Sequence, residues 1–416
     1  IQAYDGDRTA IFDRSSTSAQ SVISVVGRQY VKIIGLEVIG GANGIHVSTG
    51  SQYVYVLRNY VHNQNAGDDI KINQTDYIYV EENETKTPST RSGGGYQECI
   101  DFVDVDYSTQ RFNYCHDFGG QALYAKGGSE NSVIEGNVIY NQLDPEGPAT
   151  GFGQQTDLEY MDGATYQSYN CVYRNNIFRN CDGGAIGTYD CYHGYFYNNT
   201  VHNCGKASQN WGIIWQRMST TWSEAESNSD GVYIYNNVFL DTRGEMPVVY
   251  RYHTGNYSDW QHDYNNFYNN GSAIPIGGMY NPNSEPHSTF GNPNLYNPTG
   301  TATTWAGWVA LYRTTSSSTL LIDQGTSSAG NTPFPAVTKD IEGRTRPQGS
   351  GYDIGAHEYV SAGNPPVANF SGNPTSGYAP LTVSFTDSST NSPTSWSWTF
   401  GDAGTSTAQN PSHIYN

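Results

Sequence analysis

Apolar and polar positions alternate in short runs along the first two thirds of the chain, and the runs repeat one phrase. The phrase appears as YVYVLRNYVHN, VIEGNVIYN, VYRNNIFRN, YFYNNTVHN, YIYNNVFLD and YNNFYNN. Alternation with a period of two predicts β-strands, because successive side chains of a strand point to opposite faces. No segment repeats the longer period of an amphipathic helix, so the repeats predict an all-β structure.

An asparagine returns at the same place in each repeat. These residues are Asn59, Asn83, Asn113, Asn137, Asn176, Asn199, Asn237 and Asn266, with spacings of 24, 30, 24, 39, 23, 38 and 29 residues. A period near 24 residues with inserts of varying length is typical of a parallel β-helix, in which successive coils stack. We expect each asparagine to lie at a tight bend in the left-handed backbone conformation, hydrogen-bonded to its copies in the adjacent coils.

The repeats divide the chain into three parts. Residues 1–285 form the predicted parallel β-helix, and residues 286–363 form its last coils and a cap that covers the open strand edge. The cap ends in DIEGRTRPQGSGYDIGAHEYV, which resembles the closing segment of many secreted β-helix proteins. Residues 364–416 form a separate module that begins with a proline-rich linker.

The last module resembles the PKD domain, an immunoglobulin-like β-sandwich common on secreted enzymes and surface proteins. The resemblance rests on APLTVSF, on W-x-W-x-F-G-D and on the Asn-Pro-x-His-x-Tyr segment. Ala403 stands where the family's turn usually has glycine, and the family's last strands would follow Asn416. The predicted fold is therefore a right-handed parallel β-helix followed by a PKD-like sandwich that is cut short or completed by another segment, with the handedness taken from the rule for parallel crossovers.

Composition limits the partners. The chain has 39 acidic and 20 basic residues, a net charge of −19, which excludes nucleic acid as a partner and favours a soluble, extracellular or Ca²⁺-rich setting. No apolar run approaches the ~20 residues of a membrane helix, so membrane insertion is not expected. We therefore predict a secreted or cell-surface protein.

Two of the six cysteines, Cys181 and Cys204, follow the same motif and are 23 residues apart. They should lie one above the other on adjacent coils, either as a disulfide or as two buried thiols.

The region from residue 95 to residue 137 holds the densest set of reactive side chains. If Ile100 and Phe102 point into the core, Asp101 points outward, and Lys126 does the same on the next coil. Four successive coils then bring acids and lysines to one face: Asp68, Asp69 and Lys71; Glu98 and Asp101; Tyr124 and Lys126; Asp157, Glu159 and Asp162. A slip of one residue in the register would reverse this assignment.

The segment ALYAKGGSENSVIEGN resembles the lysine-bearing coil of β-helix polysaccharide lyases, including those that act on chondroitin-like and alginate-like polymers. The resemblance implies β-elimination on an acidic, uronate-containing polysaccharide, with Lys126 as the base. It also implies a Ca²⁺ ion that neutralises the uronate carboxylate. The carboxylates that would hold the ion are Glu98, Asp101 and Asp68 or Asp69.

The chain departs from those lyases in one respect. They often place an arginine on the coil after the base, where this chain has Asp157-Leu-Glu-Tyr. Arg174 or Arg217 would have to take its place, or the chemistry would be hydrolytic.

A glycoside hydrolase of surface or matrix polysaccharide is the alternative enzyme. Its two carboxylates flank the glycosidic bond and need no metal, and Asp157, Glu159 and Asp162 are the candidates, with Asp101 opposite. His116 is a further catalytic candidate because it precedes the lysine-bearing coil. It also follows a repeated asparagine by three residues, as other histidines do, which favours a structural position.

Two long inserts, 141–170 and 205–230, predict walls of a groove. Tryptophans stack on the apolar faces of sugars and arginines bind their polar groups, although the same inserts can pack on the flank of the solenoid. The expected substrate-binding residues are Tyr124, Arg174, Trp211, Trp215, Arg217 and Arg251.

A non-catalytic surface or fibre protein is the third interpretation. The chain begins in mid-strand and ends in mid-sandwich, so copies could self-associate by strand addition. Lys126-Gly-Gly-Ser would then be an ordinary surface turn, and Gly67-Asp-Asp a turn cap. Because the inserts and titratable groups are unevenly distributed over the coils, we favour an enzyme that acts on a polysaccharide.

Overall fold

The chain folds into two compact units, residues 1–359 and 360–416, each of which is described by itself. The structure is a computed structural model. It describes residues 1–3, 6–15, 20–87, 97–143, 147–153, 156, 160–161, 163–205, 214–217, 229–241, 249–251, 260–272, 285–329, 332–335, 337–361, 367–390 and 393–416.

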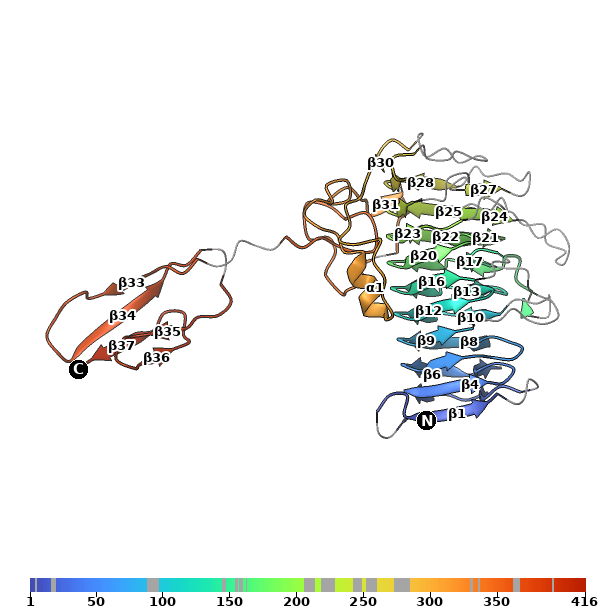
Figure 1. Ribbon diagram of the computed structural model, residues 1–416, viewed down its shortest axis with the longest axis horizontal. Helices are drawn as coiled ribbons and strands as arrows, with labels where there is room; N and C mark the ends of the chain where they lie inside the picture. The colour runs from blue at the N-terminus through green and yellow to red at the C-terminus, as the bar shows by residue number, and fades with distance from the viewer. Residues whose placement is uncertain are drawn as a thin grey trace. The chain divides into compact units, whose positions relative to one another are not determined.

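The first unit is a solenoid of stacked parallel strands whose coils have three faces (Figure 1). Face 1 is an 11-stranded sheet. Its strands are β1 (Ala10–Arg14), β4 (Leu36–Gly40), β7 (Tyr60–His62), β9 (Glu84–Lys86), β12 (Tyr114–Phe118), β16 (Val138–Gln142), β20 (Ile177–Cys181), β23 (Thr200–His202), β26 (Val238–Leu240), β29 (Asn266–Tyr268) and β30 (Thr289–Phe290).

Faces 2 and 3 form one continuous sheet because the long strands β8 and β10 contribute to both. Face 2 contains β2 (Ile23–Val26), β5 (Ile45–Ser48), β8 (Ile70–Glu81), β10 (Glu98–Asp106), β13 (Gln121–Lys126), β17 (Thr150–Phe152), β21 (Ile186–Tyr189), β24 (Ile214–Arg217) and β27 (Val249–Arg251). Face 3 contains β3 (Lys32–Ile34), β6 (Gln52–Leu57), β11 (Thr109–Arg111), β15 (Val133–Glu135), β19 (Val172–Arg174), β22 (Cys191–Tyr197), β25 (Asp230–Tyr235) and β28 (Gln261–Asp263), with β14 (Ser129–Glu130) and β18 (Ser168–Tyr169) at the corner.

The interior of the solenoid is filled by columns of apolar side chains. In face 2, Val47, Ile72 and Phe102 occupy the same position of successive coils and are fully buried. Alternate residues of each strand therefore point inward, as the period of two predicts. Burial of large apolar side chains contributes about 1.5–3 kcal/mol each, which makes stacking of the coils the main source of stability.

A buried ladder of asparagines follows the bend between faces 3 and 1. The side-chain oxygen of Asn137 accepts hydrogen bonds from the backbone and side-chain nitrogens of Asn113, at 2.9 and 3.0 Å. The same pattern runs from Asn59 through Asn237, which confirms the predicted ladder up to that point. Its last rung is Asn265, so the prediction of Asn266 was wrong; Asn266 instead donates to the hydroxyl of Thr289.

The prediction that each repeated asparagine adopts the left-handed conformation was wrong, because the residue before each ladder asparagine adopts it. Phe112 has φ of 56°, Asn175 of 55° and Tyr264 of 57°. The ladder asparagine begins the next segment and uses its amide to hydrogen-bond to backbone groups of adjacent coils. The amide of Asn137, for example, donates to the carbonyl oxygen of Gln110 at 2.9 Å.

We expect Asn113→Ala to lower the free energy of unfolding by about 3 kcal/mol, because several buried hydrogen-bonding groups lose their partner. Chemical denaturation of the variant and of Asn297→Ala, at an exposed asparagine outside the ladder, measures the effect. Equal losses in the two variants would contradict a stabilising role of the ladder.

The cysteines are buried free thiols, so the pair Cys181 and Cys204 adopts the thiol alternative rather than the disulfide. Burial, together with the hydrogen bond to Cys204, raises the pKa of Cys181 well above its ordinary value.

The end of the first unit covers one side of the solenoid. Helix α1 (Trp305–Leu311) lies beside face 1 in Figure 1, with the ring of Trp308 4.4 Å from that of Tyr140. The short strands β31 (Ser328–Ala329) and β32 (Thr332–Pro333) follow. Phe334 then stacks on Tyr197 of face 3. The predicted closing segment therefore packs along the flank of the coils.

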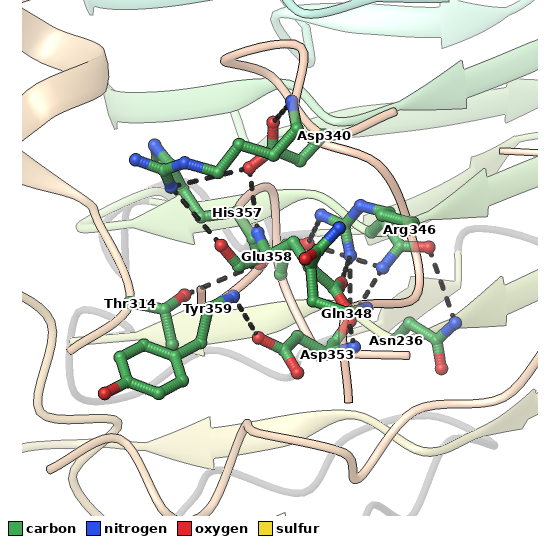
Figure 2. Close-up of polar contacts among 12 residues, drawn as sticks. Asn236, Thr314, Asp340, Arg346, Gln348, Asp353, His357, Glu358 and Tyr359 are labelled. Atoms are coloured by element: carbon green, nitrogen blue, oxygen red, sulfur yellow. Dashed lines mark hydrogen bonds and ion pairs between the residues drawn. The ribbon is translucent and has the colours of Figure 1, made fainter. Parts of the chain in front are cut away.

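A buried polar network holds this closing segment together (Figure 2). The Arg346 guanidinium is 3.1 Å from the Glu358 carboxylate and donates to the carbonyl oxygen of Gly355 at 2.8 Å. The Asp340 carboxylate accepts the backbone N–H of Glu358, and that of Asp353 accepts the backbone N–H of Tyr359. The charged residues of the segment DIEGRTRPQGSGYDIGAHEYV thus hold its own turns.

The second unit is a small antiparallel structure. Strands β33 (Phe370–Asn373), β34 (Leu381–Asp387) and β37 (Ser412–Tyr415) form one sheet, and β35 (Trp398–Thr399) pairs with β36 (Thr405–Ser406). The Asp387 carboxylate accepts the indole N–H of Trp396 at 2.9 Å.

Candidate functional site

Three adjacent strands of face 2 bring the predicted acids and lysines together. Asp101 of β10 pairs with Lys71 of β8 and with Tyr124 of β13, while Val103 pairs with Lys126. The neighbouring residues Ile100 and Phe102 are buried in the core. The predicted register is therefore confirmed, and Asp101 and Lys126 lie on the outer side of the face.

These side chains form a compact group that we call the lysine–carboxylate cluster: Asp68, Lys71, Glu98, Asp101 and Lys126. The Lys126 ammonium is 2.6 Å from Glu98 Oε1 and 3.1 Å from Asp101 Oδ1. The Lys71 ammonium contacts the other oxygen of Asp101 and is 3.4 Å from Asp68 Oδ2. Asp101, which is fully buried, thus joins two lysines from different coils.

Burial and pairing shift the pKa values of the two central acids in opposite directions. Burial and the nearby Asp101 charge raise the pKa of Glu98 well above its ordinary value. Burial also acts to raise the pKa of Asp101, but the Lys126 and Lys71 ammonium groups outweigh it and lower that pKa to about 2. Burial opposes the charge of Lys126, yet Asp101 and Glu98 raise its pKa. Lys126 is therefore protonated at neutral pH in this arrangement.

A cavity of about 360 Å³ lies over the cluster. It is lined by Asn43, His46, Lys71, Asn73, Val103, Lys126, Thr156 and Tyr160. The lysines line the cavity, whereas the carboxyl side chains of Glu98 and Asp101 are 5% and 0% exposed. A ligand in the cavity would therefore meet two ammonium groups first, with the acids beneath them.

The carboxylates offer a set of oxygens for a cation. One oxygen each from Asp68, Glu98 and Asp101 lies within 4.8 Å of the others. Hard oxygen donors of this kind suit Ca²⁺. However, two ammonium groups already contact these oxygens, so a cation would have to displace at least one of them. Asp69 is not part of this set: it is fully buried and accepts a hydrogen bond from the Thr87 hydroxyl.

The predicted sugar contact Tyr124 is fully buried. Its hydroxyl donates to the carbonyl oxygen of Pro148 at 3.1 Å, and its ring lies over Gly151, where an added Cβ would be 2.5 Å from a ring carbon. The Lys126 ammonium lies 5.7 Å from the centroid of the Tyr124 ring, so Tyr124 packs beside the cluster and does not line the cavity.

His116 and Arg174 lie on other faces. His116 on face 1 contacts Glu84 and Asp117, at 3.2 and 3.1 Å. Arg174 on face 3 is 2.7 Å from Glu135 and also contacts the carbonyl oxygen of Pro335. The structure therefore brings neither residue to the cluster.

The structure describes only some of the remaining predicted residues. Asp157, Glu159, Asp162 and Trp211 lie outside the described residues. The backbone register pairs Trp215 with Gly187 and thereby places it in the same column as Asp101, four coils further along. Arg217 pairs with Tyr189, and Arg251 pairs with Gln216.

His46 and Asn73 line the cavity but were not among the predicted site residues. His46 pairs with Lys71 in the adjacent coil, and its Nε2 is 2.6 Å from the side-chain oxygen of Asn73. Aligning IHVS, IKIN and IDFV as equivalent segments would have placed His46, Lys71 and Asp101 in one column.

The stacked coils define the class of protein as a parallel β-helix. A family model described as right handed beta helix region matches residues 21–239, and one described as PKD domain matches residues 363–416. The chain belongs to the right-handed β-helix family and carries a C-terminal PKD domain, as the repeats and the tail predicted.

Among solved structures, the chain is similar to the catalytic domain of a GH87 alpha-1,3-glucanase variant in complex with tetrasaccharides. The similarity covers 57% of this chain and 49% of that chain, with 12% sequence identity and a TM-score of 0.29. This chain thus spans about half of that structure. No curated protein sequence matches it. In the part of the chain that the structure describes, no helix has the length and apolar character of a membrane span.

Proposed function

We propose that the protein is a secreted enzyme that cleaves an acidic, uronate-containing polysaccharide in the cavity over the lysine–carboxylate cluster. The observation that carries the proposal is the placement of Lys71 and Lys126 at the cavity with three acids behind them. Ammonium groups at a partly buried surface attract a carboxylate strongly, because little water competes for the charge. The buried acids hold both lysines in position.

β-Elimination would use the cluster as follows. Lys71 binds and neutralises the uronate carboxylate, which acidifies the C5 proton. Lys126 passes its proton to Glu98, 2.6 Å away, and its neutral amine then removes the C5 proton. The electron pair forms the C4–C5 double bond and expels the glycosidic oxygen, which takes the proton that Lys126 has just accepted. Glu98 then returns its proton to Lys126, which restores the ion pair. Exclusion of water by the substrate favours the proton transfer, since it replaces two buried charges with two neutral groups.

Hydrolysis is the second candidate, and the opposite pKa shifts of Glu98 and Asp101 favour it. A carboxylic acid with a raised pKa next to an ionised carboxylate is the pairing that glycosidases use as general acid and as base or nucleophile. In this mechanism Glu98 would protonate the leaving oxygen. Both acids would first have to become accessible, which makes elimination the preferred proposal.

The test is digestion of a panel of pectate, alginate, chondroitin and neutral polysaccharides by the full chain. Ultraviolet absorbance of unsaturated product ends reports elimination, and new reducing ends without that absorbance report hydrolysis. Absence of both products with every polymer would refute the proposed activity and favour a non-catalytic surface or fibre protein.

Ca²⁺ is the metal that the donor set would take, and when bound it would neutralise the substrate carboxylate in place of an ammonium group that it displaces. If Asp68, Glu98 and Asp101 bind it, Ca²⁺ should raise the melting temperature of the wild type in a thermal unfolding assay, and Asp101→Asn should remove that shift. Mg²⁺ is the control, because it prefers a smaller and more regular site. Equal shifts in wild type and variant would place the ion elsewhere, and no shift would mean that the lysines alone neutralise the acids.

A further inference from the structure

A row of stacked tyrosines runs along the corner between faces 2 and 3. The row consists of Tyr30, Tyr53, Tyr77 and Tyr107, one from each of four successive coils. Successive ring centroids are 5.1, 5.1 and 5.7 Å apart, and the rings are nearly parallel. The spacing follows that of the coils, so the row lies along the axis of the solenoid.

The backbone does not favour tyrosine at this corner. The four φ angles are between 50° and 59°, in the left-handed region, where a bulky side chain is strained and glycine or asparagine is preferred. The next two coils have Asn131 and Asn170 at the same corner position, with φ of 53° and 50°. The fold can therefore use asparagine here, and the tyrosines require another explanation.

The tyrosine row is accessible. Tyr30 is 75% and Tyr107 is 52% exposed, and the two central tyrosines are partly buried between their neighbours. Their four hydroxyl groups form no hydrogen bond to any residue that the structure describes. The row therefore presents a line of hydroxyl donors and acceptors at a constant spacing.

A second polar row lies directly beside the tyrosines. It consists of the residue before each tyrosine: Gln29, Gln52, Asp76 and Asp106. The Gln52 amide donates to Asp76 Oδ2 at 3.3 Å, so the side chains of this row also follow one another along the axis. Amide, carboxylate and phenol groups are suitable partners for sugar hydroxyls, and Asp76 and Asp106 would repel a polyanion.

We propose that the tyrosine row binds a neutral polysaccharide chain lying along the solenoid axis. A ligand that meets equivalent groups at equal intervals must itself repeat, and an extended glycan offers hydroxyl groups at each unit. The interface with a protein partner would instead be depleted of charged groups at its core. This surface is distinct from the lysine–carboxylate cluster, whose ammonium groups suit an anionic ligand, and the proposal does not depend on the activity proposed there.

The test compares the wild-type full chain with the triple variant Tyr53→Asn, Tyr77→Asn, Tyr107→Asn. Binding is measured by affinity electrophoresis in gels that contain soluble xylan, mannan or β-glucan, and by sedimentation with cellulose and chitin. Loss of three hydroxyl contacts should weaken binding by at least about tenfold. The melting temperature should stay the same or rise, because asparagine suits the left-handed conformation better. Tyr296→Asn and Tyr378→Asn, at exposed tyrosines outside the row, are the controls and should bind as the wild type does.

Three results would overturn the proposal. The first is that the wild type binds none of the neutral polymers, and the second is that the triple variant binds as tightly as the wild type. The third is that the triple variant melts at a clearly lower temperature. The last result would mean that ring stacking in the tyrosine row is needed to hold the corner. Replacement of the same three residues with phenylalanine, which keeps the rings, tells whether the hydroxyls carry the binding.

Discussion

Lys126→Arg is expected to lower the rate of polysaccharide cleavage by about 10³-fold while the protein stays folded. The guanidinium group can replace the ammonium in the ion pairs with Glu98 and Asp101, so the buried acids remain neutralised. It cannot act as the base, because arginine does not give up its proton at any accessible pH. The variant therefore separates proton transfer from charge neutralisation.

The measurement is the initial rate of formation of unsaturated ends, together with the melting temperature. Lys86→Arg is the matched control, because Lys86 also pairs with a carboxylate, that of Asp117, at 3.2 Å on another face. Full activity in Lys126→Arg would exclude Lys126 as the base and leave it a purely electrostatic role. A loss of activity accompanied by unfolding would say nothing about the catalytic role of Lys126. In that case the melting temperature of Lys71→Arg shows whether the cluster tolerates the exchange of a lysine for an arginine.

Asp101→Asn is expected to lower the free energy of unfolding at neutral pH by about 3–5 kcal/mol. Removal of one charge from a buried group of ion pairs leaves its partners uncompensated, here the Lys71 and Lys126 ammonium groups. Glu98→Gln should lower the free energy of unfolding by less than Asp101→Asn does. Because burial raises the pKa of Glu98 whereas the lysines lower that of Asp101, the folded protein loses less when the charge of Glu98 is removed.

Lowering the pH should reduce the difference in the free energy of unfolding between the wild type and Asp101→Asn. The pKa of Asp101 is lowered to about 2 in the folded protein, whereas an unfolded aspartate titrates near pH ~3.9. The stabilisation from its ionised form is therefore fully present above pH ~4 and is lost as the pH falls toward 2. Urea unfolding of both proteins at pH 7 and at pH 3, with a chelator present, measures this difference at each pH. An equal difference at the two pH values would show that the hydrogen-bonding geometry, and not the charge, stabilises the cluster.

The asparagine ladder illustrates how far a repeated phrase can predict position. Where two asparagines are adjacent, as in Asn175-Asn176, the first takes the left-handed bend and the second enters the ladder. At residues 264–266 the bend falls on Tyr264, so Asn265 enters the ladder. The phrase YNNFYNN does not distinguish the two asparagines, because the stacking of one coil on the next makes the choice.

The residues around Asp101 also show which part of the site the sequence predicts and which part depends on the tertiary structure. Alternation along a strand correctly placed Asp101 and Lys126 on the outer side, because an apolar residue on each side of Asp101 must enter the core. Alternation could not show that Tyr124, also on the outer side, is buried. Its ring is covered because the next coil has glycine at the paired position and Pro148 nearby, which depends on the path of an insert.

The sequence by itself determined the class of fold, the PKD domain, the ladder and the outward register of the acids and lysines. Each follows from local periodicity or from a contiguous motif, in which the interacting residues recur at a constant interval. The tertiary structure alone decided that two lysines pair with three buried acids, that His46 and Asn73 join them at the cavity, and that Arg174 and His116 do not. These contacts depend on the alignment of coils separated by inserts of unequal length, and a shift of one residue would have brought other side chains together.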